Sequence, residues 1–109
     1  MPAASSPVSG IGKIDDVIHG RLRLGVMAYL ANAEVADFNE LKALLEVTQG
    51  NLSVQLRKLE DAHYVDIEKG YLGRKPRTQV RITAAGRAAF AAYLEALGQL
   101  IGPNAAPPA

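Results

Sequence analysis

Apolar side chains recur at every third or fourth position through the first regular stretch of the chain, residues 14–31. This spacing predicts a helix, because residues three and four apart lie on the same helical face. Asp15 and Asp16 stand near its expected start, where carboxylates interact favourably with the helix dipole. Gly20 interrupts the pattern, and glycine inside a helix costs about 1 kcal/mol relative to alanine. We therefore expect a break near Gly20.

A second, shorter helix is predicted where cap residues precede the leucine-rich segment LKALL. Asp37 and Asn39 are both suited to the N-cap, and Glu40 can complete a capping box. The helix is expected to begin at Asp37 or Asn39 and to end near Glu46. Residues 35–38 are expected to contribute a short piece of strand just before it.

A third helix is predicted to follow after a short turn, with Thr48 as its N-cap. Leu52, Leu56 and Leu59 repeat at i, i+4 and i+7, so they share one buried face. The opposite face carries hydrogen-bonding side chains at its start and cations further along. The residues expected to face away from the core are Gln49, Asn51, Ser53, Val54, Arg57 and Lys58.

The hydrophobic period then changes from helical to two, in residues 64–68 and again in residues 79–83. Such alternation predicts two strands of a hairpin, each with one buried face. The inward positions are Val65, Ile67, Val80 and Ile82. The connection between these strands, which contains GYLGRKPRT, is expected to be a loop of about ten residues. Common hairpin loops have about two to five residues, and much longer ones are usually functional or mobile.

The last predicted element is an alanine-rich helix from Ala84 to Ile101. Its apolar stripe consists of Phe90, Tyr93, Leu94, Leu97, Leu100 and Ile101. A small domain buries a modest fraction of its surface, and this stripe exceeds what one small face needs. We expect the stripe to pair with a second copy of the chain, together with the first helix. The alternative is that it packs back on its own domain.

The two ends of the chain differ in composition from the part between them. Residues 1–12 and 102–109 are rich in proline, alanine and serine, and we expect both to be disordered tails. Residues 13–101 are expected to form one domain, which includes the C-terminal helix 84–101. A total of 109 residues is too short for two domains of ordinary size.

Composition excludes several classes of function. The chain is 49% hydrophobic and 21% charged, and no apolar run approaches the roughly 20 residues of a membrane span. The first ten residues do not read as a secretory signal, so we expect a cytoplasmic protein without a membrane partner. Cysteine is absent and His19 and His63 are 44 positions apart, so neither a metal nor another cofactor is expected. No catalytic motif is present, and we do not expect an enzyme.

Positive charge is concentrated in one segment, although the formal net charge of the whole chain is only +1. Residues 1–68 hold six Lys and Arg against ten Asp and Glu, whereas residues 69–87 hold six Lys and Arg and no acid. Such asymmetry is typical of a surface that contacts a polyanion such as nucleic acid. A solvated basic surface without a partner is the alternative.

The order of these elements and three segments of the sequence resemble the small single-domain winged helix-turn-helix regulators of the MarR/ArsR group in bacteria. The segments are IHGRLRLGVMAYL, DFNELKALLEVTQGNLSVQLRKLEDAHYVDIEKGYLGRKPRTQVRIT and AAGRAAFAAYLEAL, which together cover about residues 18–97. The resemblance implies an α+β, mainly helical fold with a two-stranded wing and a C-terminal dimerisation helix. It also implies a sequence-specific regulator of transcription that binds double-stranded DNA as a homodimer on a palindromic operator. Residues 41–46 would then be the supporting helix, residues 48–62 the recognition helix and residues 64–83 the wing.

The expected DNA contacts of the recognition helix are Thr48, Gln49, Gly50, Asn51, Ser53, Val54, Arg57 and Lys58. Amides and hydroxyls can read base edges, while arginine and lysine suit phosphates. Helix capping by Thr48 and Asn51, with ordinary surface polarity elsewhere, is the competing interpretation. Gly50 would be explained either by a close approach to DNA or by crowding against the preceding helix.

The expected DNA contacts of the wing are Arg74, Lys75 and Arg77, on phosphates or in the minor groove. No acid lies near them in the sequence to neutralise them, and a solvated loop is the alternative. Arg81 is expected to form a cross-strand ion pair with Asp66 or Glu68 at least as readily as a phosphate contact. His63 stands where this family more often has glycine, so we expect it to adopt left-handed backbone geometry with some strain.

Other functions are compatible with a winged helix, because the fold alone does not decide what it binds. A protein–protein interaction module and a non-specific nucleic-acid binder, including one for RNA, are the alternatives. His19 is expected to be a partly buried structural residue rather than a ligand sensor. A small-molecule effector, if there is one, would bind near the dimer interface, since the chain has little room for a separate sensor domain.

Overall fold

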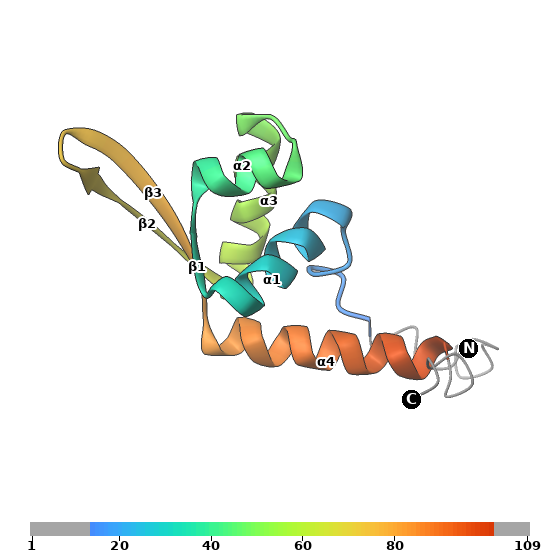
Figure 1. The fold of residues 1–109 in the computed structure, drawn as a ribbon. Coiled ribbons are helices and arrows are strands. Elements are labelled where there is room, and N and C mark those ends of the chain that lie inside the picture. Colours follow the sequence, from blue (N-terminus) through green and yellow to red (C-terminus); the bar gives the residue numbers. More distant parts are fainter. Residues whose placement is uncertain (1–13, 102–109) are drawn as a thin grey trace.

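The computed structural model describes residues 14–101 of the chain. The two predicted disordered tails lie outside these residues. In chain order the elements are α1 (Arg21–Ala33), β1 (Val35–Asp37), α2 (Phe38–Leu45), α3 (Gln49–Asp61), β2 (Val65–Leu72), β3 (Lys75–Ile82) and α4 (Ala84–Ile101). The predicted α+β, mainly helical fold class is confirmed (Figure 1).

Residues 14–20 form a turn rather than the first part of the predicted helix 14–31, so the predicted helix start was wrong. The predicted break near Gly20 is confirmed. Oδ1 of Asp15 accepts hydrogen bonds from the backbone N–H groups of Val17 at 2.8 Å and Ile18 at 3.2 Å. Asp15 therefore stabilises a separate turn, because aspartate readily bonds to backbone groups two and three residues ahead. The helix α1 begins only after Gly20, whose extended backbone makes it the N-cap.

Helices α2 and α3 begin where the predicted cap residues stand. Glu40 accepts a hydrogen bond from the backbone N–H of Asp37 at 3.3 Å, and α2 starts with Phe38. The hydroxyl of Thr48 accepts one from the N–H of Asn51 at 3.1 Å, and α3 starts with Gln49. Both caps supply partners to backbone groups that the helix itself leaves unsatisfied.

The three strands form one antiparallel sheet in the order β1-β3-β2. The predicted piece of strand before α2 is β1, and Val35–Asp37 pair with residues 79–81 of β3. The prediction of a loop of about ten residues is wrong, since β2 and β3 stay paired until Leu72 meets Lys75 across a two-residue turn. Beyond Ile67 the hairpin leaves the core, so both its faces meet solvent and hydrophobic alternation no longer marks the strands.

Pro76 lies within β3 although proline cannot donate a backbone hydrogen bond. The register places it opposite Tyr71, one step beyond the Leu72–Lys75 pair that closes the turn. The backbone N–H groups of every second residue in a strand point to the same side. The N–H of Ile82 points towards β1 and bonds to the carbonyl of Glu34, so the backbone nitrogen of residue 76 also points to the β1 side. Pairing with β1 reaches only residues 79–81, and no ladder bond is lost at Pro76.

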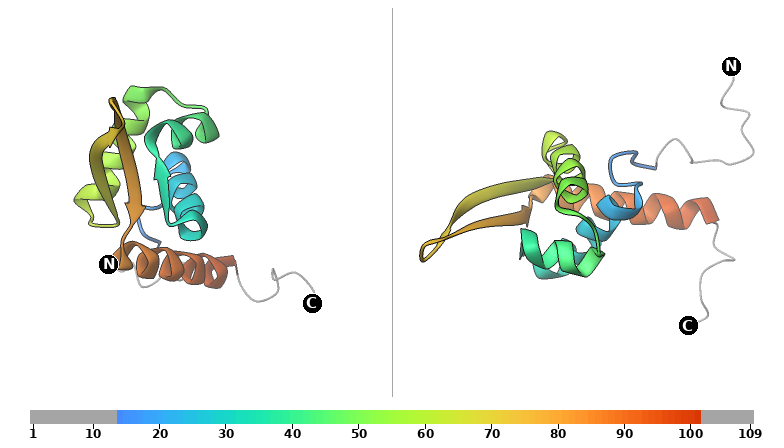
Figure 2. Two further views of the ribbon diagram at one scale, coloured as in Figure 1. Left: turned by 60° about the vertical axis from the view of Figure 1, so that its left-hand side comes forward. Right: turned by 90° about the horizontal axis from the view of Figure 1, so that it is seen from above.

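The core lies where α1, α2, α3, the base of the hairpin and α4 meet. Its buried side chains include Ile18, Met27, Leu30, Leu41, Leu52, Leu56, Leu59, Val65, Val80 and Tyr93. In Figures 1 and 2 the helix α4 lies beneath α1 and crosses it, and the hairpin projects away from the helical body. The base of the wing is therefore part of the core, while its outer half is free to contact a partner.

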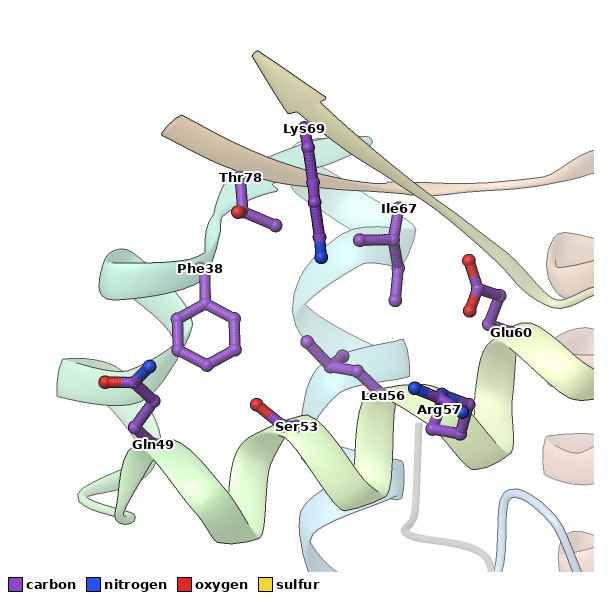
Figure 3. Close-up of a pocket in the computed structure, with 9 residues that line it drawn as sticks. All are labelled: Phe38, Gln49, Ser53, Leu56, Arg57, Glu60, Ile67, Lys69 and Thr78. Carbon is purple, nitrogen blue, oxygen red and sulfur yellow. The ribbon is translucent and has the colours of Figure 1, made fainter. Parts of the chain in front are cut away.

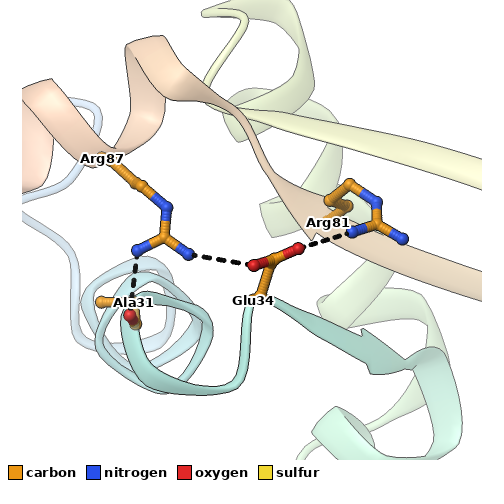
Figure 4. A network of polar contacts seen from close by, with 4 residues as sticks. All are labelled: Ala31, Glu34, Arg81 and Arg87. Atoms are coloured by element: carbon orange, nitrogen blue, oxygen red, sulfur yellow. Dashed lines mark hydrogen bonds and ion pairs between the residues drawn. The ribbon is translucent and has the colours of Figure 1, made fainter.

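Glu34, just after α1, is linked by its carboxylate to both β3 and α4 (Figure 4). Its Oε2 lies 3.0 Å from Nη1 of Arg81 on β3, and its Oε1 lies 3.7 Å from Nη2 of Arg87 on α4. Arg87 also donates to the carbonyl of Ala31 at 3.1 Å. The expected ion pair of Arg81 is thus present, but its partner is Glu34 rather than Asp66 or Glu68.

Candidate nucleic-acid interface

The outward face of α3 is fully open to solvent. Leu52, Leu56 and Leu59 are buried beneath it, as their spacing predicted. The positions proposed to contact DNA are all exposed, namely Thr48, Gln49, Gly50, Asn51, Ser53, Val54, Arg57 and Lys58. Val54 is 53% exposed near the middle of this face. A helix with polar, cationic and small apolar groups on one open face is suited to base edges in a major groove.

Asn51 belongs to a chain of side-chain hydrogen bonds that links α3 to α1. Its Oδ1 accepts from Nε2 of Gln55 at 3.1 Å, and Oε1 of Gln55 accepts from Nη1 of Arg23. Arg23 is held in turn by the backbone carbonyl of Val17. Sequence reasoning missed Gln55 and Arg23. The i, i+4 spacing of Asn51 and Gln55 was a usable signal, but nothing in the sequence indicates the contact with Arg23.

Gly50 has open space around it. A Cβ atom built at this position would meet nothing within 4 Å. Crowding against the preceding helix, one of the two explanations for glycine here, is therefore excluded. Close approach of a partner to the backbone remains.

A groove of about 600 Å³ separates α3 from the hairpin (Figure 3). It is lined by Phe38, Gln49, Ser53, Leu56, Arg57, Glu60, Ile67, Lys69 and Thr78. Phe38, Leu56 and Ile67 are the apolar residues of this lining. Arg57 from α3 and Lys69 from β2 contribute positive charges, and Glu60 contributes a negative charge. Lys69 was not among the predicted wing contacts, although it stands two residues beyond the inward-facing Ile67 in a strand.

The three predicted wing cations are in different surroundings. Arg74 lies in the turn and Lys75 at the start of β3, and both are exposed. Among residues 14–101, neither forms an ion pair. Arg77 differs, because its Nε lies 3.0 Å from Oδ1 of Asp37. No acid lies near Arg77 in the sequence, but the fold brings Asp37 to it from 40 residues away.

The predicted dimer face of α4 divides into an inner and an outer part. Tyr93 is 2% exposed and its hydroxyl lies 3.0 Å from Nδ1 of His19, so it belongs to the chain's own core and not to an exposed face. Phe90 and Leu97 are half-buried against that core, and Leu100 is half-buried as well. Leu94 and Ile101 are 50% and 61% exposed. His19 is exposed rather than partly buried, although it makes this contact.

Two tyrosine hydroxyls form hydrogen bonds that connect elements next to the candidate nucleic-acid interface. Tyr64, just after α3, donates to Oδ2 of Asp15, and this hydrogen bond to a carboxylate raises the pKa of Tyr64 to about 12. Tyr29 on α1 donates to Oε2 of Glu40 on α2, which likewise raises the pKa of Tyr29. A carboxylate acceptor favours the protonated phenol, because ionisation would remove the donor and set two negative charges together.

Within residues 14–101, no group of three or more His, Cys, Asp or Glu side chains is placed to hold a metal ion. No helix in the same range has both the length and the apolar character required to cross a membrane.

A family model and a related protein each match most of the chain. The family model described as a winged helix DNA-binding domain matches residues 22–101. An uncharacterised protein of the archaeon Methanocaldococcus jannaschii is 34% identical over 84 residues, which cover 77% of this chain and 91% of the relative.

Solved structures of transcriptional regulators are similar to this chain. A transcriptional regulator homologue from Pyrococcus horikoshii OT3 is 33% identical with a TM-score of 0.74, and the match covers 78% of this chain and 84% of that one. A protein of Enterococcus faecalis V583 assigned to the MarR family of transcriptional regulators is 27% identical with a TM-score of 0.66, covering 88% and 86%. A regulator of the ArsR family, RHA00566, shares the fold at 17% identity and a TM-score of 0.55, covering 90% and 94%. The similar proteins thus include archaeal as well as bacterial ones.

Proposed function

The chain belongs to the family of winged helix DNA-binding domains, and we propose that it regulates transcription as a homodimer bound to an inverted-repeat sequence in double-stranded DNA. The main support for this proposal is that the exposed face of α3 lies next to a hairpin that projects from the domain. Between them lies a groove to which each contributes a cation, Arg57 and Lys69. Such a surface fits a duplex, in which major groove, phosphate backbone and minor groove follow one another.

In this arrangement α3 enters the major groove, as in other helix-turn-helix proteins. Its outermost positions Gly50, Val54 and Arg57 approach the base edges and the nearby backbone, and Gln49, Asn51 and Ser53 flank them. Thr48 and Lys58 lie at the two ends of this surface. Arg74 and Lys75 of the wing, which form no ion pair within residues 14–101, then reach the phosphate backbone or the minor groove next to the major groove that α3 reads.

The exposed apolar residues of α4 are proposed to pair the two copies. Leu94 and Ile101 expose apolar surface that a second copy can cover, and Leu97 and Leu100 border it. Two-fold symmetry would place the two α3 helices in successive major grooves about 34 Å apart. We also propose a cytoplasmic location, because a DNA-binding protein acts on the chromosome, which lies in the cytoplasm of bacteria and archaea.

The function is tested by selecting bound sequences from randomised double-stranded DNA at two salt concentrations. We expect enrichment of an inverted repeat, with an affinity that falls steeply as salt rises because bound counterions are released from DNA. Salt-sensitive binding without an enriched sequence would indicate a non-specific nucleic-acid binder. No binding at low salt would reject the proposal and favour a protein-interaction module.

A further inference from the structure

The tip of the hairpin carries two adjacent, solvent-exposed apolar side chains. Tyr71 is 74% exposed and Leu72 is 64% exposed. They project from opposite faces of the hairpin, because successive residues of a strand alternate. Tyr71 continues the row of Ile67 and Lys69, which line the groove along α3. Leu72 stands in the opposite row with Gly70.

The neighbours of Tyr71 also belong to the surface that faces α3. Tyr71 is paired with Pro76 across the hairpin. Pro76 lines a second, smaller groove of about 210 Å³ together with Gln49, the first residue of α3. Tyr71 therefore extends the candidate interface to the tip of the wing, whereas Leu72 does not.

We propose that Tyr71 is a DNA-binding residue whose ring packs against deoxyribose and base edges in the minor groove that the wing enters. This inference rests on the proposed function. The minor groove is bounded by phosphates and walled by apolar sugar edges, and proteins enter it with apolar side chains flanked by cations. Tyr71 has those flanking cations, with Lys69 in its own row and Arg74 and Lys75 across the turn. Residues 69–87 contain no acid that would repel a phosphate.

Packing within the hairpin does not account for Tyr71. An aromatic ring opposite a cross-strand neighbour can stabilise a sheet, but only through the surface that the neighbour covers. With 74% of the residue exposed, Pro76 covers little of the ring. The chemistry of the surroundings, basic and continuous with the α3 groove, favours DNA over an apolar protein partner.

The test compares Tyr71→Ala with the matched variant Leu72→Ala on the duplex selected by the wild-type protein. Tyr71→Ala is expected to weaken binding by roughly five- to fiftyfold, which lies within the range found when an aromatic side chain that stacks on a base is removed. Leu72→Ala is expected to bind within about twofold of wild type, because Leu72 lies on the other face, from which its cross-strand neighbour Lys75 reaches the phosphates only with the end of its long side chain. The slope of affinity against salt should stay unchanged in both, since neither variant removes a cation. Thermal unfolding of both variants controls for loss of the fold.

A further variant reports the contact between residue 71 and DNA directly. The chain has no tryptophan, so Tyr71→Trp introduces a single tryptophan at the tip, whose fluorescence can be excited separately from that of the remaining tyrosines. Its emission should shift to the blue or be quenched when the selected duplex is added, because the ring leaves water. An unchanged spectrum on binding would overturn the inference.

The remaining outcomes separate a failure of this inference from a failure of the proposed function. If wild type binds a duplex while Tyr71→Ala and Leu72→Ala bind equally well, the inference fails and the proposed function stands. If the two substitutions instead alter self-association, the tip is a contact between copies and the inference is rejected. If wild type binds no duplex, both fail together.

Discussion

Arg77 on β3 and Asp37 at the N-cap of α2 are joined by an ion pair, with Nε of the arginine 3.0 Å from Oδ1 of the aspartate. Arg77 is the innermost of the three cations that the sequence assigns to the wing. The side chain of Arg77 is 37% exposed, and its charge is balanced within the chain. The outer half of the hairpin is thus tied to the helix-turn-helix, while Arg74 and Lys75 stay available at its tip.

This difference predicts separate effects for the wing cations. Arg74→Ala is expected to weaken DNA binding and to reduce the salt slope by about 1, as the loss of one phosphate contact would. Arg77→Ala should change the slope less and should lower the free energy of unfolding by up to about 1 kcal/mol, the range for a partly exposed ion pair. Titrations over several salt concentrations and denaturant unfolding measure the two effects. Equal slopes for both variants would contradict this assignment.

Gly50 offers a variant in which stability and binding are expected to change in opposite directions. Gly50→Ala adds a methyl group where there is open space within the chain, and alanine favours a helix by up to about 1 kcal/mol over glycine. We expect a more stable protein that binds its duplex more weakly, because the methyl group meets the DNA backbone. Denaturant unfolding and a binding titration of the same preparation provide the test. Unchanged affinity would show that DNA does not approach Gly50 closely.

His63 ends α3 with a backbone φ of 66°, in the left-handed region expected from the sequence. The N–H groups of His63 and Tyr64 bond to the carbonyls of Glu60 and Leu59, which is the hydrogen-bond pattern of a Schellman motif. His63→Gly is expected to raise the free energy of unfolding by about 0.5–1 kcal/mol, because glycine avoids the steric cost of a Cβ in this region. His63→Ala is the control. Equal stabilisation by alanine would attribute the effect to the lost imidazole rather than to the backbone.

The hydrogen bond from Tyr64 to Asp15 predicts a stability change at high pH. The pKa of Tyr64 is raised above its ordinary value of 10 to about 12, so folding favours the protonated phenol. Its contribution to stability is therefore complete below pH 10 and is lost as the pH rises towards 12. Tyr64→Phe should be less stable than wild type at neutral pH, and the gap should narrow between pH 10 and 12. Urea unfolding of both proteins at several pH values measures the gap, and a constant gap would contradict the prediction.

Leu94 tests the proposed dimer, and Leu44 on α2 provides its control. The two leucines are 50% and 51% exposed, so a charge at either position should disturb the fold of one chain to a similar degree. Leu94→Glu is expected to dissociate the dimer and to lower affinity for an inverted repeat, because a buried unpaired carboxylate is costly. Leu44→Glu should leave the molar mass in light scattering unchanged. A dimer that survives Leu94→Glu would move the interface away from this face.

Local features of the sequence predicted the caps and the buried faces of the helices. Thr48 and Glu40 act on backbone groups three residues away, and Leu52, Leu56 and Leu59 share a face by spacing alone. The base of the wing was equally readable, since one face of each strand is buried there. Hydrophobic periodicity and capping both depend on residues close along the chain, so the sequence by itself determined these elements and the open face of α3.

The tertiary structure decided which distant residues meet. Asp37 reaches Arg77 and Glu34 reaches Arg81 across 40 and 47 positions, because β1 lies against β3. The same topology turns Tyr93 inward to His19 and leaves Leu94 outside. The outer half of the hairpin was invisible to pattern analysis, since backbone pairing continues where both faces are solvated. Ion pairs and strand length depend on how elements pack, and packing brings together side chains that no local spacing relates.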